Sequence, residues 1–403
     1  MNIPKLRFKE FTDEWIAIKL NDISKIFDYG MNVASTSFDG KNKYIRITDI
    51  DDVSHKFLKN NIVSPSGSLE DKYLVRNDDI LFARTGASTG KTYLYNSNDG
   101  ILYFAGFLIR INVLKSYNSY FIFQNTLTKK YTDWVKVESI RSGQPGINAE
   151  QYKSYSIKCP TLAEQNKIAN FLTTVDKKIT NLENTITSLE NQKKGLLQQI
   201  FSQKLRFKDK NGNNYPNWEK KKLGDICKFT GGGTPSTSIL KYWNGTIPWI
   251  SSSDLQTNTI HKIKISRYIT NEAVSNSSTK IIPKNSILIV SRVGVGKVAI
   301  SNCVLCTSQD FTNITEINGN TTFYAYLLKY KMEQLTQNTQ GTSIKGITTS
   351  DIKNIKLIVP IEQTEQTKIA DFLSEFDRKL DNQKAQLEHW QQIKKGLLQQ
   401  MFV

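Results

Sequence analysis

The chain has 403 residues, a formal net charge of +17 and an apolar content of 38%. Its length predicts two or more domains with separate cores, and its composition excludes an intrinsically disordered chain. No run approaches the roughly 18 apolar residues that a membrane helix needs. Since residues 1–7 also hold no apolar signal region, we expect a cytoplasmic protein. The four cysteines do not predict a disulfide framework.

Residues 1–159 are predicted to form a first strand-rich domain. Short β-branched and aromatic runs punctuated by Gly and Asn indicate mostly strands, with one amphipathic helix near 118–131. The run Asp79–Arg84 leads into a Gly-rich loop that reaches Gly90-Lys91. This loop is one residue too short for a nucleotide-binding P-loop and is not followed by a helix start. We interpret it as a contact for a nucleic-acid backbone or base edge. The alternative, a hairpin in which Arg84 only caps the turn, stays open.

Residues 160–203 are predicted to form a long helix that begins just after Pro160. Its seam residues follow one another at alternating steps of four and three, the a/d pattern of a coiled coil. These positions are Ile168, Leu172, Val175, Ile179, Leu182, Ile186, Leu189, Lys193, Leu196 and Ile200.

Residues 204–359 are predicted to form a second domain that repeats the outline of the first. Lys204–Lys208 matches Lys5–Lys9, and the run from Ser286 to Arg292 parallels Asp79–Arg84 before it reaches Gly296-Lys297. An amphipathic helix is expected near 321–336. A further Gly-rich segment precedes each long helix, at 141–148 and 340–347.

Residues 360–403 repeat the first long helix. At an offset of 201, Glu164–Phe201 and Glu365–Phe402 are identical at 18 of 38 positions. Two like helices in one chain are expected to pack antiparallel about an approximate two-fold axis. Identity extends beyond the seam, so we interpret the shared surface as two equivalent docking sites for one kind of partner. The candidate docking residues are Lys167, Phe171, Asp176, Lys194, Gln198, Lys368, Phe372, Asp377, Lys395 and Gln399.

These elements together predict an α+β fold. It has two mixed, strand-rich domains (1–159 and 204–359), separated by two long helices (160–203 and 360–403) that pack as an antiparallel coiled coil with pseudo-two-fold symmetry. The positive charge lies in the domains: 22 basic against 17 acidic residues in 1–160, and 19 against 9 in 207–359. This distribution favours contact with a polyanion through the domains.

The candidate nucleic-acid contacts are basic and polar residues of the Gly-rich loops. Arg suits bidentate contact with guanine, and Gly lets the backbone approach phosphates. In the first domain they are Arg84, Lys91, Arg141, Gln144 and Asn148, and in the second Arg292, Lys297, Gln340, Thr342, Ser343 and Lys345. Three scattered histidines and the absence of an Asn-Pro-Pro-Tyr/Phe element predict no catalytic centre. Cys303-Val-Leu-Cys306 has the spacing of a zinc ligand pair, but without a second pair we expect no metal site.

Several motifs carry a family resemblance. The second half contains the runs Thr230–Ser236 (TGGGTPS), Tyr242–Trp249 (YWNGTIPW) and Ser251–Leu255 (SSSDL). Each repeated helix has a proline followed closely by Glu-Gln and then Lys-Ile-Ala-x-Phe-Leu. These residues resemble the specificity subunits of type I restriction–modification systems, and the order of variable part, helix, variable part and helix fits the whole chain. The first half lacks the Gly-Gly-Thr-Pro and Tyr-Trp elements and is more divergent.

The resemblance implies a non-catalytic subunit with two target-recognition domains, each reading one half of a bipartite DNA site. The helices would set the spacer and dock two methylation subunits that bring S-adenosylmethionine. Restriction subunits would join that core and bring ATP hydrolysis, with Mg, and cleavage. No cofactor is expected on this chain itself. The alternative is a stand-alone bipartite DNA-binding protein without an enzyme partner.

Overall fold

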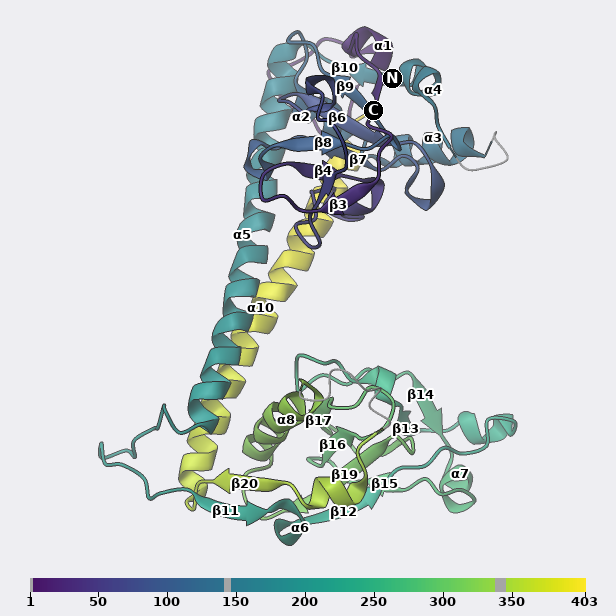
Figure 1. Cartoon of the computed structure of the whole chain (residues 1–403). Coiled ribbons are helices and arrows are strands. Elements are labelled where there is room, and N and C mark those ends of the chain that lie inside the picture. The colour runs from purple at the N-terminus through teal and green to yellow at the C-terminus, as the bar shows by residue number, and fades with distance from the viewer. Residues whose placement is uncertain (1–2, 141–145, 338–345) are drawn as a thin grey trace. The chain divides into compact units, whose positions relative to one another are not determined.

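The computed structural model describes residues 3–140, 146–337 and 346–403. The chain forms two compact units: unit 1 holds residues 1–183 and 385–403, and unit 2 holds residues 184–384. Each unit contains one strand-rich domain and a part of both long helices, α5 (Leu162–Phe201) and α10 (Gln363–Met401) (Figure 1). Packing therefore divides the chain within the long helices, whereas the sequence division follows their ends.

Unit 1 contains ten short strands and four short helices among its described residues. The strands are β1 (Ile16–Lys19), β2 (Asp28–Tyr29), β3 (Ser35–Ser37), β4 (Lys43–Ile45), β5 (Val63–Pro65), β6 (Asp79–Ala83), β7 (Thr92–Leu94), β8 (Leu102–Phe104), β9 (Leu108–Asn112) and β10 (Ser156–Cys159). The helices are α1 (Leu20–Ile23), α2 (Ser119–Asn125), α3 (Lys129–Ser139) and α4 (Ala149–Ser154). The largest sheet has the order β2-β9-β6-β7, and β1 pairs antiparallel with β10.

Unit 2 repeats this plan. Its strands are β11 (Glu219–Lys222), β12 (Cys227–Gly231), β13 (Ile247–Ile250), β14 (Arg267–Ile269), β15 (Ile281–Ile282), β16 (Ile287–Val290), β17 (Val298–Ile300), β18 (Leu305–Thr307), β19 (Phe311–Ile317) and β20 (Lys356–Val359). Its helices are α6 (Leu223–Ile226), α7 (Asn271–Ser275), α8 (Thr321–Gln337) and α9 (Thr349–Lys353). The sheet order β12-β19-β16-β17 and the pair β11-β20 correspond strand for strand to unit 1.

One predicted helix is wrong. The sequence predicts a single helix near 118–131, whereas the structure has α2 and α3 with a break between them. The break follows from local capping: the Thr128 side chain accepts a hydrogen bond from the Tyr131 backbone N–H and starts α3. The expected helix near 321–336 is confirmed as α8, which is continuous through Gln337.

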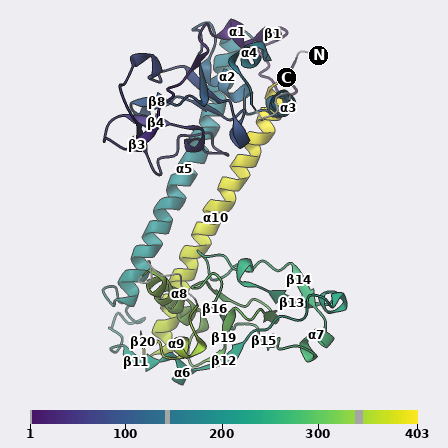
Figure 2. The same ribbon diagram turned by 45° about the vertical axis from the view of Figure 1, so that its right-hand side comes forward.

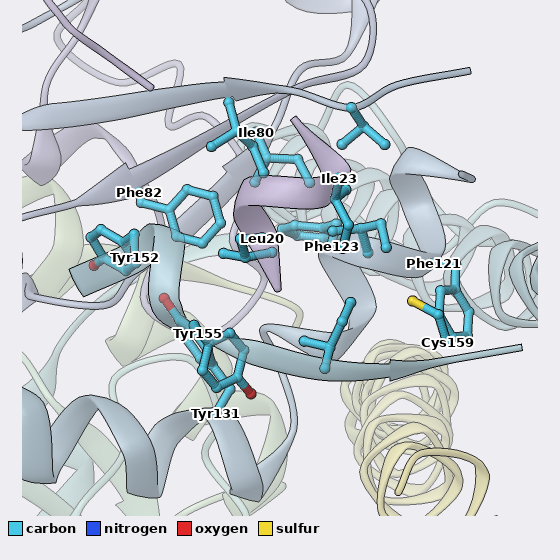
Figure 3. Close-up of a cluster of buried hydrophobic side chains, with 14 of the residues drawn as sticks. Leu20, Ile23, Ile80, Phe82, Phe121, Phe123, Tyr131, Tyr152, Tyr155 and Cys159 are labelled. Carbon is cyan, nitrogen blue, oxygen red and sulfur yellow. The ribbon is translucent and has the colours of Figure 1, made fainter. Parts of the chain in front are cut away.

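The cores of both units join domain and helix residues. In unit 1, Trp15, Phe82 and Phe121 belong to one buried cluster with Leu172 of α5 and Leu398 of α10. Figure 3 shows the part of this cluster around Phe82, whose ring lies 4.9 Å from that of Tyr152. The corresponding cluster of unit 2 includes residues of both helices as well. Each domain is therefore held to the helix pair by shared apolar burial, the dominant favourable term in folding.

The long helices pack antiparallel within each unit, as the sequence predicts (Figures 1 and 2). In unit 1, Asp176 of α5 pairs with Lys394 of α10 at 2.8 Å. In unit 2, Lys193 of α5 pairs with Asp377 of α10. The predicted seam is confirmed: from Ile168 to Ile200 its members are buried, apart from half-buried Leu196. None of the helices in the described residues is long and apolar enough to cross a membrane.

A tyrosine of each domain joins these ion pairs. The Tyr120 hydroxyl of α2 donates to Asp176, and the Tyr326 hydroxyl of α8 donates to Asp377 at 2.7 Å. We call each trio, Tyr120–Asp176–Lys394 in unit 1 and Tyr326–Asp377–Lys193 in unit 2, a carboxylate node. Each node connects three elements: the strand-rich domain of its unit and both long helices. Burial and the neighbouring carboxylate raise the pKa of both phenols, which therefore stay protonated donors.

The two nodes predict unequal losses of stability. The side chains of Lys193 and Asp377 are only 8% and 6% exposed, against 19% and 30% for Lys394 and Asp176. Lys193→Met leaves a buried carboxylate without its cation and should lower the free energy of unfolding by about 3–5 kcal/mol. The matched Lys394→Met variant should lose about 1 kcal/mol or less. Urea unfolding checks both values, and equal losses would contradict the assignment of the unit 2 node as the buried one.

A buried lysine beside the unit 2 node predicts a stability change at alkaline pH. Burial, followed by the nearby Lys193 ammonium, lowers the pKa of Lys329 to about 8. The Glu333 and Asp377 carboxylates raise this pKa and Lys384 lowers it, but all three act more weakly. Between pH 8 and the ordinary lysine pKa, the unfolded chain binds more protons than the folded one, so stability should rise with pH. Above about pH 10 ordinary tyrosines of the unfolded state begin to oppose this rise. Unfolding free energies measured from pH 7 to 10 should rise for the native chain and stay flatter for Lys329→Met, and parallel curves would contradict the argument.

Candidate functional site

The first turn of each long helix holds a buried glutamate that anchors its own domain. In unit 1, Glu164 accepts hydrogen bonds from the Arg7 guanidinium at 2.8 Å and the Trp15 indole N–H at 3.3 Å. In unit 2, Glu365 accepts from Arg206 at 2.8 Å and Trp218 at 3.1 Å. A buried glutamate with a bidentate arginine and an indole donor is fully compensated. The glutamate and the Leu-Arg-Phe segment therefore recur together in both halves of the chain, because the arginine of the segment binds the glutamate.

The predicted docking residues of the first helix turns also contact the domains. Phe171 lies edge-on to Phe8 with ring centroids 5.9 Å apart, and Lys167 pairs with Glu10 at 3.1 Å. In unit 2, Phe372 lies 5.3 Å from Phe207, and Lys368 donates to the Lys208 carbonyl at 2.6 Å. Asp176 and Asp377 belong to the carboxylate nodes. Many of the residues that are identical in the two long helices thus hold each domain on the helices. The comparison of the two sequence repeats did not predict this role.

Four of the predicted docking residues are exposed and lie near the C-terminal ends of the two helices: Lys194, Gln198, Lys395 and Gln399. Their identity in both copies is not explained by seam packing, because they lie outside the buried face. Docking of a partner at these four positions stays a prediction. Lys167, Phe171, Lys368 and Phe372 are exposed as well, so their contacts with the domains leave the docking prediction untested.

The Gly-rich loop after β6 is folded back on its own strand. The Ala83 N–H donates to the Lys91 carbonyl at 2.8 Å, and the Gly90 N–H donates to the Ala83 carbonyl at 2.9 Å. The Lys91 ammonium donates to the Ile50 carbonyl at 3.0 Å and pairs with Asp52. Its side chain is only 11% exposed. Lys91 therefore holds this loop against the loop at 50–52, and its contact with DNA stays a prediction.

The loop after β16 uses the same construction. The Val290 N–H donates to the Lys297 carbonyl at 2.9 Å, and the Lys297 ammonium donates to the Ser252 carbonyl at 3.0 Å. In each domain the lysine of the Gly-Lys pair thus ties its loop to a neighbouring loop through a backbone carbonyl. We call this contact the loop fastener. Arg292 lies in the same loop, and its side chain is exposed.

The second Gly-rich segment of each domain approaches the end of the same strand. The Ile147 N–H donates to the Arg84 carbonyl at 2.9 Å, and the Ile347 N–H donates to the Ser291 carbonyl at 2.7 Å. Asn148 caps helix α4 by accepting from the Gln151 N–H at 2.9 Å. The predicted contacts Arg141, Gln144, Gln340, Thr342, Ser343 and Lys345 lie outside the described residues. The structure therefore brings the described flanks of both predicted loops together in each domain.

Sequence reasoning missed two aromatic residues at this place in unit 1. The Arg84 guanidinium lies 4.8 Å from the centre of the Tyr29 ring. The Arg84 N–H donates to the Phe107 carbonyl at 3.0 Å, which places Phe107 at the same strand end. Neither residue lies near Arg84 in the sequence, so only the strand pairing of β2, β6 and β9 brings them together.

An open hollow of about 1120 Å³ lies within unit 1 between the domain and the helices. The loops at 51–59 and 87–91 line one side, and Asp176, Ile179, Lys394 and Lys395 line the other. Lysines and carboxylates both line it, so its charge favours no single class of ligand. No group of three or more His, Cys, Asp or Glu side chains in the described residues is arranged to hold a metal ion.

Comparison with known proteins identifies the two-domain arrangement. Residues 12–191 and residues 215–389 match the family model described as Type I restriction modification DNA specificity domain. Two such domains, each seated on a repeated helix, define a DNA-specificity protein. The chain belongs to the type I restriction–modification DNA specificity family, which is non-catalytic.

Individual relatives carry the same description. Over 208 residues the chain is 36% identical to the Type I restriction enzyme MjaIX specificity subunit of Methanocaldococcus jannaschii, covering 50% of this chain and 48% of that protein. Over 244 residues it is 30% identical to the EcoR124I/EcoR124II specificity subunit of Escherichia coli, covering 57% of each. The match thus spans about half the length of these two curated relatives.

Solved structures support the fold over the full length. The S subunit of the type I restriction–modification system from M. genitalium has a TM-score of 0.59 with this chain at 17% identity, covering 100% of this chain and 99% of that one. A chain from a structure on complex assembly and conformational transition of the type I R-M system gives a TM-score of 0.55 at 16% identity, over 95% and 96%. The predicted fold class and family are confirmed, and the stand-alone alternative is not favoured.

The two glycines of the loop after β6 predict unequal losses of stability on substitution by alanine. Gly90 has φ +86°, and a Cβ there would lie 2.5 Å from Cγ1 of Val135. Gly86, in the same loop, has φ +70° with no atom within 4 Å of an added Cβ. Gly86→Ala should therefore cost about 1–2 kcal/mol from backbone strain alone. Gly90→Ala should cost about 1–3 kcal/mol more from the clash, and the second substitution Val135→Ala should recover part of that excess. Unfolding free energies check the series, and equal losses for both glycines would contradict it.

Proposed function

We propose that this chain is the DNA-reading subunit of a type I restriction–modification complex and that each domain reads one half of a bipartite site. The observation that carries the proposal is a duplicated framework with unlike surfaces. Both units repeat the same sheet order, glutamate anchor and loop fastener. The side chains at the loop ends differ, with Arg84 beside Tyr29 in unit 1 and an exposed Arg292 in unit 2. The same framework with different side chains at the loop ends supports recognition of a different DNA sequence by each domain.

The repeated helices support one kind of partner used twice. The exposed and identical pairs Lys194/Lys395 and Gln198/Gln399 are the residues we propose as contacts for two methyltransferase subunits. The helix pair would also set the number of base pairs between the half-sites. Restriction subunits would join this core, with all members acting on DNA in the cytoplasm.

The chemistry would reside in those partners. We propose that the methylation subunits bring S-adenosylmethionine and that the restriction subunits bring ATP hydrolysis, with Mg, and cleavage. This chain would hold no cofactor of its own. Its contribution is the binding free energy that distinguishes one DNA sequence from another.

A base-resolution map of methylated adenines in the host genome, with and without this gene, tests the proposal. Loss of one asymmetric two-part motif on deletion is the expected result. It would give both half-sites and the spacer together. An unchanged methylation map in a strain with active partner subunits would refute the proposal.

Arg292 provides a test of the domain assignment. If its exposed guanidinium reads a base, Arg292→Ala should cost about 1–3 kcal/mol and relax the motif only in the half-site of unit 2. Arg378→Ala is a matched control, because Arg378 is an exposed arginine of α10 whose guanidinium pairs with Glu375 of the same helix. Uniform weakening on all sequences would instead make Arg292 a phosphate contact. The readout is the methylation map of each variant expressed from the native locus.

A further inference from the structure

The two domains share one backbone framework at the strand ends next to the Gly-rich loops. The Arg84 N–H donates to the Phe107 carbonyl at 3.0 Å, and the Ser291 N–H donates to the Asp310 carbonyl at 2.8 Å. Each carbonyl belongs to the residue that precedes an equivalent strand, β9 or β19. Arg84 therefore corresponds in space to Ser291, and Phe107 corresponds to Asp310.

The neighbouring strands extend this correspondence. Tyr29 of β2 pairs with Ile109, one residue into β9, and Gly231 of β12 pairs with Thr312, one residue into β19. In both domains the next residue is a glycine, Gly30 or Gly232, whose added Cβ would overlap a carbonyl oxygen at the end of β8 (Phe104) or just after β18 (Ser308). Only glycine fits such a close backbone approach. We call the three corresponding positions the strand-end patch: Tyr29, Arg84 and Phe107 in unit 1, and Gly231, Ser291 and Asp310 in unit 2.

The patch of unit 1 is aromatic and cationic. Phe107 is 58% exposed and Tyr29 is 41% exposed, although phenyl rings are normally buried. The Tyr29 hydroxyl accepts from the Ala149 N–H at 3.1 Å, which holds this ring beside the segment that follows the second Gly-rich loop. The ring in turn supports the Arg84 guanidinium. An exposed phenyl group at the same strand end as an oriented guanidinium is typical of a binding surface.

The patch of unit 2 is polar and has no ring. The Asp310 carboxylate accepts from the Ser308 hydroxyl at 3.1 Å, and the Ser291 hydroxyl donates to the Asp310 carbonyl at 3.0 Å. The adjacent Gln309 is exposed and its side chain accepts from the Thr234 hydroxyl. Asp310, whose carboxylate is held by Ser308, thus stands at the backbone position that Phe107 holds in unit 1.

These two side-chain sets match different base edges. In the major groove, arginine pairs with guanine, and an apolar group such as phenyl contacts the thymine methyl. A carboxylate instead accepts from the cytosine amino group. Since the backbone framework is shared, Phe107 and Asp310 would meet the DNA at equivalent positions of the two domains. Their different side chains would then select different bases.

We propose that the strand-end patch is the base-selecting surface of each domain. In unit 1, Phe107 contacts a thymine methyl next to a guanine held by Arg84. In unit 2, Asp310 accepts a hydrogen bond from a cytosine amino group. The inference rests on the proposed function, since it names the bases and residues of the same DNA-reading role.

The first experiment compares methylation maps for the full chain with its partner subunits. Phe107→Ala should make one thymine position of a single half-site degenerate, with discrimination at that position falling at least about fivefold. Asp310→Asn should do the same at one cytosine position of the other half-site. Ile16→Ala and Asp225→Asn are the matched controls, because Ile16 is 69% exposed on β1 and Asp225 is exposed on α6, both away from the patch. Both controls should leave the motif unchanged.

A second measurement isolates the methyl contact. The purified complex is titrated with a DNA duplex that carries deoxyuridine in place of thymidine at the sensitive position. Removal of the methyl group should weaken binding by the native complex at least about fivefold and leave binding by the Phe107→Ala complex unchanged. Equal weakening of both complexes would overturn the Phe107 assignment.

The outcomes separate this inference from the function on which it rests. If the native chain directs no two-part motif, the proposed function fails and the patch assignment fails with it. If the native motif appears and both variants keep it intact, only the patch assignment is overturned. Uniform loss across all sites, with the circular dichroism spectrum unchanged, would also overturn it, because a base contact cannot weaken every sequence equally.

Discussion

The architecture depends on a carboxylate that is shared by three elements. Asp377 of α10 meets Lys193 of α5 and the hydroxyl of Tyr326 from the recognition domain, and Asp176 makes the same set of contacts in unit 1. In unit 2 this charge is so poorly solvated that it is tolerated only when its partners are present. The helix register and the position of the domain on the helices are therefore coupled most strongly in unit 2. This constraint lets a small domain with short strands hold its reading loops in a defined place.

The sequence predicts the framework well because its signals are periodic or repeated. The alternating seam of α5, from Ile168 to Ile200, requires only one buried face, and Pro160 marks its start. The strand-rich domains follow from β-branched runs between Gly and Asn. The break between α2 and α3 escaped prediction because Thr128 acts as a cap through a single side-chain contact, which hydrophobic periodicity does not register.

The candidate site is less predictable because it is assembled by strand pairing. Arg84 could be selected from its loop, but Tyr29 and Phe107 are brought to it by β2 and β9 from distant parts of the chain. Chemistry alone also does not reveal the partners that a side chain finds within the fold. Lys91 and Lys297 have the charge for a phosphate contact, and in the structure both ammonium groups also donate to backbone carbonyls of a neighbouring loop. A lysine's partner depends on the fold around it, which its neighbours in sequence do not specify.

The two node tyrosines do not occupy equivalent positions in their helices. Phe121 and Phe323 both contact the anchoring tryptophan edge-on, which aligns α2 with α8. By that alignment Tyr120 corresponds to Thr322, yet the hydroxyl of unit 2 comes from Tyr326, about one helical turn later. The long helices thus require a hydroxyl at one point in space and do not prescribe the residue that delivers it. Because only one hydroxyl position is required, the rest of each domain can change in sequence during evolution. New DNA specificities can then arise while the contacts that hold the domain on the long helices stay the same.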